Sequence, residues 1–93
     1  MGSPARHRQA GPMPTVLWSG PYRFFFYAGD CDEPAHVHVR HGNSEAKFWL
    51  DPVGLARNRG FNPHELGRIQ RIVRIRSREL KRAWDDYHGP EAG

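Results

Sequence analysis

The stretch His36–Leu50, HVHVRHGNSEAKFWL, decides the fold that this sequence predicts. Gly42 and Asn43 divide it into two strand-like segments, and a glycine at the first central position favours a type II′ hairpin turn. A two-residue loop fixes the register and places Arg40 opposite Glu45, a favourable cross-strand ion pair. The sequence therefore predicts an antiparallel β-hairpin at the centre of the fold.

The predicted register divides the side chains of the hairpin between two faces, because successive strand residues point to opposite sides. The apolar face collects Val37, Val39, Ala46, Phe48 and Leu50. The polar face collects His36, His38, Arg40, Glu45, Lys47 and Trp49. We expect the apolar face to pack against a helix, which leaves both histidines on the face away from that helix.

One long helix of about 25 residues is predicted to begin after Asn62 and to end before Gly89. Asn62 is a favourable N-cap, and Glu65 is placed to complete a capping box. At ~100° per residue, an apolar stripe forms from Leu66, Ile69, Ile72, Val73, Leu80, Ala83, Trp84 and Tyr87. Arg76 falls inside this stripe, so we expect it to reach water or to pair with a carboxylate, with Glu45 and Asp51 as candidates.

Two more segments complete the predicted fold. Residues 23–27 carry a strong strand signal, and residues 53–57 form a weaker candidate strand. The fold class is therefore α+β, a small antiparallel sheet of three or four strands packed against one long C-terminal helix. We expect a single domain over residues 13–89, with residues 1–12 a disordered arm and residues 90–93 a disordered tail.

Composition narrows the classes of function. The 93-residue chain has a formal charge of +4 and a pI near 9.8, which favours a polyanion or an acidic protein as partner. No apolar run approaches the roughly 20 residues of a membrane span, and no secretory signal is recognisable. Cys31 is the single cysteine, so no intramolecular disulfide can form. We expect a cytoplasmic protein without a membrane partner.

Several motifs together resemble a known family. These are EPAHVHV at residues 33–39, EAKFWLDPV at residues 45–53, Gly60-Phe61 and Ala83-Trp84. In this combination the chain resembles the small bacterial domain of unknown function numbered 4160, over roughly residues 13–89. The resemblance implies a short, stand-alone, cytosolic protein, often encoded beside another small domain in a suspected toxin–antitoxin pair. It implies no reaction. Ala35 departs from the family pattern, which usually has a second proline there.

His36 and His38 are the sharpest chemical feature of the sequence. Two imidazoles on one strand face can act as acid and base near neutral pH, or can bind a transition metal. A metal site needs a third ligand, for which the candidates are Asp30, Asp32, Glu33 and Glu45. Arg40 and Lys47 lie beside the pair and repel a cation. We therefore expect no metal and no cofactor.

Three hypotheses for the function remain open. The first is a nucleic-acid- or partner-binding component of a toxin–antitoxin-like pair, which holds an RNA or DNA backbone or an acidic protein encoded nearby. Its expected binding residues are Arg40, Trp49, Arg68, Arg71, Arg74, Arg78, Lys81 and Arg82. The second is a metal-independent ribonuclease with His36 and His38 as acid and base and Lys47 or Arg40 on the phosphate. The third is a structural domain that binds an acidic protein through its basic helix.

Overall fold

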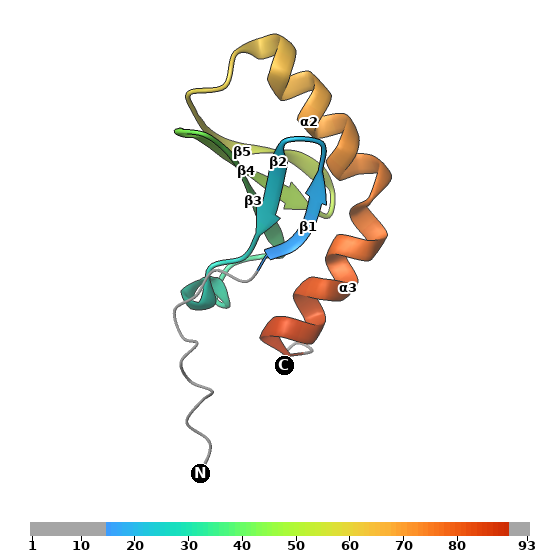
Figure 1. Cartoon of the computed structure of the whole chain (residues 1–93). Helices are drawn as coiled ribbons and strands as arrows, with labels where there is room; N and C mark the ends of the chain where they lie inside the picture. Colours follow the sequence, from blue (N-terminus) through green and yellow to red (C-terminus); the bar gives the residue numbers. More distant parts are fainter. Residues whose placement is uncertain (1–14, 90–93) are drawn as a thin grey trace.

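The computed structural model describes residues 15–89 as one antiparallel sheet that carries two helices on one face (Figure 1). The five strands lie in chain order, and a short 3₁₀ helix, η1, joins the second to the third. The elements are β1 (Thr15–Ser19), β2 (Tyr22–Phe25), η1 (Ala28–Asp30), β3 (His36–His41), β4 (Ser44–Leu50), β5 (Val53–Arg59), α2 (Pro63–Ile75) and α3 (Ser77–His88). The α+β class is confirmed. The predictions for residues 1–12 and 90–93 lie outside the described residues.

The central hairpin has the predicted register. Arg40 pairs with Glu45 and His38 with Lys47, and the same register continues along β3 and β4. Gly42 has a φ of 64°, and no described residue other than glycine has a positive φ. A positive φ at the first central position alone is the pattern of a type II′ turn.

The sheet is larger than the predicted three or four strands. β1 was not predicted; it pairs with β2 across a tight turn at Gly20, whose φ is 57°. β5 extends to Arg59, beyond the predicted end at residue 57, because its second half continues to pair with β4. β2 ends at Phe25, and the chain leaves the sheet so that the side chain of Phe26 enters the core.

The prediction of a single long helix is wrong. The chain bends between α2 and α3 at Arg76, whose φ is −100° and ψ is 15°. A straight helix would direct Arg76 onto the sheet, between buried Val73 and Leu80. The bend instead leaves its side chain 36% exposed and paired through two hydrogen bonds with Glu79, at 2.7 and 3.0 Å. Pairing with a carboxylate is confirmed, but the partner is neither Glu45 nor Asp51.

The core forms between the helices and the apolar face of the hairpin. The predicted residues Val37, Val39, Ala46, Phe48 and Leu50 are all buried, and they pack with Ile69, Val73, Leu80 and Trp84 from the helices. Asn62 caps α2 by accepting the Glu65 N–H at 2.8 Å. The Glu65 carboxylate itself accepts a hydrogen bond from the Tyr22 hydroxyl at 2.9 Å, which ties α2 to β2.

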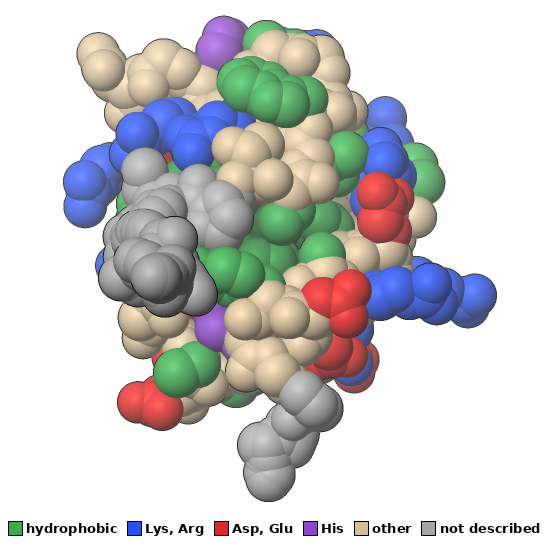
Figure 2. Space-filling view, turned by 60° about the horizontal axis from the view of Figure 1, so that its bottom comes forward, with side chains coloured by type: hydrophobic (Ala, Val, Ile, Leu, Met, Phe, Trp, Pro, Cys, Tyr) green, Lys and Arg blue, Asp and Glu red, His purple; other side chains and the backbone are tan. Residues whose placement is uncertain are grey.

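The surface is basic at its margins. In the view of Figure 2, Lys and Arg side chains gather at two opposite edges of the molecule, with a strip of hydrophobic side chains between them. Within residues 15–89, neither helix combines the length and the apolar character needed to cross a bilayer.

Candidate functional site

A histidine–carboxylate cluster lies where η1 meets the start of β3. Tight turns hold the connecting segment, because the Asp30 N–H donates to the Tyr27 carbonyl and the Glu33 N–H to the Asp30 carbonyl. These turns bring the Asp30 carboxylate against β3. One oxygen, Oδ2, lies 2.7 Å from His36 Nε2 and 2.9 Å from His38 Nε2. A single carboxylate oxygen therefore joins both imidazoles.

The hydrogen bonds of His36 constrain its protonation. Its Nδ1 lies 2.8 Å from the Pro34 carbonyl oxygen and its Nε2 faces the Asp30 oxygen, so both ring nitrogens meet acceptors. A neutral imidazole carries only one N–H. Both contacts are satisfied when His36 carries two protons, or when Asp30 carries one. A neutral His36 beside an ionised Asp30 would leave one of these two acceptors without a proton.

His38 is almost fully buried and is held differently. Burial lowers its pKa, although the hydrogen bond to Asp30 partly opposes this effect. Its Nδ1 makes no hydrogen bond and lies 3.6 Å from the Glu45 carboxylate. Burial alone would raise the pKa of Asp30, but the hydrogen bonds from His38 and His36 outweigh it and lower that pKa. The carboxylate therefore stays ionised.

The hairpin register predicted that both histidines lie away from the helices, but only His38 does so. His38 stacks on Phe25 and touches Tyr27, on the face away from α2 and α3. His36, however, lies with its ring centroid 4.8 Å from that of Trp84 in α3. After the bend at Arg76, α3 contacts β3 and β4, and its Trp84 lies against His36 at the start of β3. Both imidazoles are consequently buried.

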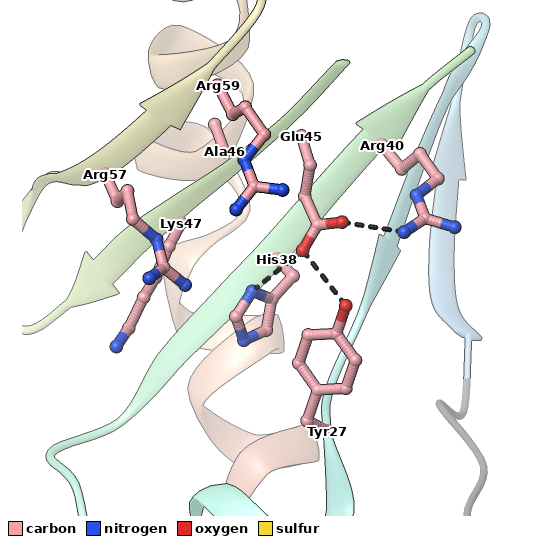
Figure 3. Close-up of a pocket in the computed structure, with 8 residues that line it drawn as sticks. All are labelled: Tyr27, His38, Arg40, Glu45, Ala46, Lys47, Arg57 and Arg59. Carbon is pink, nitrogen blue, oxygen red and sulfur yellow. Dashed lines mark hydrogen bonds and ion pairs between the residues drawn. The ribbon is translucent and has the colours of Figure 1, made fainter. Parts of the chain in front are cut away.

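Beside the cluster, the sheet face away from the helices carries a polar hollow of about 350 Å³ (Figure 3). We call it the basic hollow. It is lined by Tyr27, His38, Arg40, Glu45, Ala46, Lys47, Arg57 and Arg59. Strand pairing explains the lining, since two cross-strand rows meet there: Arg40, Glu45 and Arg59 in one, and His38, Lys47 and Arg57 in the other.

Some of the charges in the hollow are already neutralised. Glu45 accepts from Arg40 at 2.8 Å and from the Tyr27 hydroxyl at 3.1 Å. Lys47 pairs with Glu33, and this hydrogen bond lowers the pKa of the glutamate. No residue within 15–89 forms an ion pair with Arg57 or Arg59, and both are exposed. The surplus positive charge of the hollow therefore resides on β5.

Arg57 and Arg59 were not among the site residues predicted from the sequence. The pairing of β4 with β5 is irregular: Phe48 pairs with Leu55 and Lys47 with Arg57, so Ala56 is an extra residue. Such a bulge moves the residues after it to the opposite face. Leu55 therefore shares a row with the apolar residue Phe48, whereas the arginines face the hollow. Their spacing of two residues indicated that they share one face of a strand. No sequence pattern indicated the bulge that determines which face this is.

The predicted binding residues do not form one site. Trp49 is half-buried near the hollow, with Lys47 Nζ 4.8 Å from its ring centroid. The helix cations, which were predicted as a second binding surface, lie on the opposite layer of the molecule. These are Arg68, Arg71, Arg74, Arg78, Lys81 and Arg82. Lys81 lies 3.9 Å from Asp51 and Arg68 is 3.3 Å from His64. The structure brings together only the sheet residues.

The fold and the site define a small α+β domain in which a buried histidine–carboxylate cluster borders a basic sheet face. The chain belongs to the family described as "Domain of unknown function (DUF4160)", whose model matches residues 22–85. The matched region contains the cluster and the whole basic hollow, so both belong to the family domain. Neither the curated proteins nor the solved structures gave a match to the chain.

Proposed function

We propose that this domain binds the phosphate backbone of single-stranded nucleic acid across its basic hollow. The observation that carries the proposal is the composition of the hollow: four cationic side chains line it against the single carboxylate of Glu45. Two of the cations, Arg57 and Arg59, have no ion pair with residues 15–89. Guanidinium groups form bidentate hydrogen bonds with phosphate oxygens.

The surroundings of the hollow favour a single strand. A sheet face that offers cations together with an aromatic ring binds single strands by holding phosphates and stacking a base. Trp49 supplies that ring at the Lys47 end of the hollow. No helix lies on this face, so it offers no recognition helix for the groove of a duplex. Binding is expected to be mainly electrostatic and weakly selective for sequence.

The alternative functions have less support. A ribonuclease that uses His36 and His38 as acid and base needs both imidazoles to reach the substrate, yet both are buried and aim Nε2 at Asp30. An acidic protein partner, whether or not it belongs to a toxin–antitoxin-like pair, would use the helix cations on the opposite layer. The helix face also carries a hollow with arginines, lined by Ile75, Arg76, Arg78, Glu79 and Arg82, but no aromatic ring lines it.

Fluorescence anisotropy with a labelled single-stranded RNA of mixed sequence tests the proposal. The double variant Arg57→Gln/Arg59→Gln should bind at least roughly tenfold more weakly. Its log–log dependence on salt should also be shallower by about 1.4, since each phosphate contact contributes about 0.7 for a single strand. Arg78→Gln/Arg82→Gln, on α3, removes the same charge and is the matched control.

The control decides between the hypotheses. Equal losses in the two double variants would indicate generic charge attraction and contradict a site in the hollow. A larger loss in the α3 variant would transfer binding to the helix face. Cleavage of the RNA that disappears in His38→Ala would favour the ribonuclease instead.

A further inference from the structure

We propose that Asp30, His36 and His38 form a binding site for a divalent transition-metal ion such as zinc. Each residue offers one ligand atom, and the three atoms lie within 4.8 Å of one another. Two imidazoles and one carboxylate are ligands that zinc and its neighbours in the first transition row accept. The metal site borders the basic hollow, because His38 belongs to both, but the inference does not rest on phosphate binding and goes beyond the proposed function.

A neutral His36 cannot donate to both of the acceptors that it faces, because a neutral imidazole carries only one N–H. Both nitrogens of His36 face oxygen acceptors, although this side chain is completely buried. A metal ion between His36 Nε2 and Asp30 removes the conflict, because it takes the place of the proton on Nε2. The imidazole is then neutral, keeps one proton on Nδ1 and donates it to Pro34. At His38 the proton of the neutral ring moves from Nε2 to Nδ1, which lies 3.6 Å from the Glu45 carboxylate, and Nε2 becomes the third ligand.

The ring nitrogens that point away from Asp30, His36 Nδ1 and His38 Nδ1, both lie near oxygen atoms. Histidines that bind metals through one nitrogen usually donate the other N–H to a carbonyl or a carboxylate. His36 Nδ1 lies 2.8 Å from the Pro34 carbonyl oxygen. His38 Nδ1 is buried without a hydrogen bond and lies 3.6 Å from Glu45, which Arg40 and Tyr27 hold in place. Both rings thus present Nε2 to a common point.

The charges around the three ligand atoms also favour a metal ion. From the sequence, Arg40 and Lys47 count against a metal because a cation repels another. In the structure each is paired with a carboxylate, Arg40 with Glu45 and Lys47 with Glu33. The carboxylate of Asp30 has no Lys or Arg partner among residues 15–89, where its ion pairs are with the two imidazoles. The point where the ligand atoms meet therefore has a local charge that favours a cation.

The geometry leaves room for an ion and for solvent. Metal–ligand bonds of about 2.0–2.1 Å place tetrahedral ligand atoms about 3.3 Å apart, slightly farther than the 2.7 and 2.9 Å seen here. Asp30 lies in the three-residue helix η1 and its side chain is 22% exposed, so a small outward shift provides this space. Three protein ligands leave a coordination position for water.

Cobalt(II) titration of the full chain, purified without a polyhistidine tag and treated with a chelator, tests the proposal. We expect one equivalent per chain, visible absorption typical of four- or five-coordinate cobalt, and displacement by zinc. Zinc should also raise the melting temperature, because it binds the folded state. Asp30→Asn and His38→Ala should abolish stoichiometric binding, and Glu45→Gln should weaken it about 10–100-fold.

Two controls keep the test specific. His64→Ala removes an exposed histidine from α2 and should bind cobalt like the wild type. Arg57→Gln/Arg59→Gln should still take up one equivalent of cobalt per chain, which separates the metal ligands from the phosphate-binding charges. Circular dichroism establishes that Asp30→Asn, a nearly isosteric change in a partly exposed loop, remains folded. No saturable cobalt uptake by the wild type, or uptake that Asp30→Asn and His38→Ala leave unchanged, would overturn the proposal.

Discussion

At the scale of single residues, carboxylates meet several of the polar side chains that this domain buries. The two buried histidines of β3 share the carboxylate of Asp30. Tyr22 is only 2% exposed, and its hydroxyl donates to the carboxylate of Glu65. An unpaired buried polar group costs about 1–3 kcal/mol, which is a large share of the stability of a small domain. These contacts therefore determine which arrangement of the elements is stable.

Tyr22→Phe should lower the free energy of unfolding by about 1–2 kcal/mol, because it removes one hydrogen bond to a charged group. Urea unfolding measures this difference, and Tyr87→Phe is the control, since Tyr87 is 40% exposed. Burial, together with Glu65, raises the pKa of Tyr22. A raised phenol pKa means that stability is complete below pH ~10 and falls as the pH rises further. The two proteins should thus converge in alkali; a difference that grows there would contradict this account.

At the scale of elements, local backbone features position the functional side chains. The bulge in β5 moves Arg57 and Arg59 to the face that carries the basic hollow. After the bend at Arg76, Trp84 of α3 lies against His36. Between β5 and α2, the Asn58 side chain donates to the Phe61 carbonyl and accepts the Phe61 N–H. This loop fixes where α2 begins.

Gly60, in the same loop, should not tolerate alanine. Its φ is 105°, and an added Cβ would lie 3.2 Å from the Cα of Ser44. We expect Gly60→Ala to destabilise the domain by about 1–3 kcal/mol. Gly67→Ala is the matched control, because Gly67 is exposed within α2 with no atom near an added Cβ. It should stabilise by about 0.5–1 kcal/mol. If urea unfolding shows that both variants change the free energy of unfolding in the same direction, this explanation is wrong.

At the scale of the whole molecule, Trp84 connects the helical layer to the histidine cluster. Its ring centroid lies 5.4 Å from that of Phe26 and 4.8 Å from that of His36. The side chain is buried, so it contributes to the core and also shields one imidazole from water. A domain of this size has a stability of roughly 4–11 kcal/mol at 0.05–0.15 kcal/mol per residue. One large core side chain is therefore decisive.

Trp84→Ala should cost about 3–5 kcal/mol, close to half of that stability, because it removes apolar contacts and opens a cavity. Trp18→Ala is the control: Trp18 is 62% exposed, and its loss should change stability by less than about 0.5 kcal/mol. Far-UV circular dichroism should follow the unfolding, since each variant alters the tryptophan fluorescence. Similar costs for the two variants would mean that α3 does not dock as described.

Local sequence patterns specify the central hairpin, its register and its apolar face. The glycine turn and the period of two act between residues that are near one another in the chain, so a local pattern specifies them. The N-cap at Asn62 and the apolar stripe of the helices were determined in the same way. The pairing of Arg40 with Glu45 followed directly from the register.

The composition of the site depends on tertiary contacts between segments that are distant in the sequence. Asp30 joins the histidines because turns in the loop after β2 direct it onto β3, and nothing local requires that contact. The bulge at Ala56 and the bend at Arg76 arise where strands and helices must fit a twisted sheet and a shared core. Their energy comes from packing between segments that are distant in sequence. A periodic pattern contains no information on it, so the arginines of β5 and the burial of His36 emerged only in three dimensions.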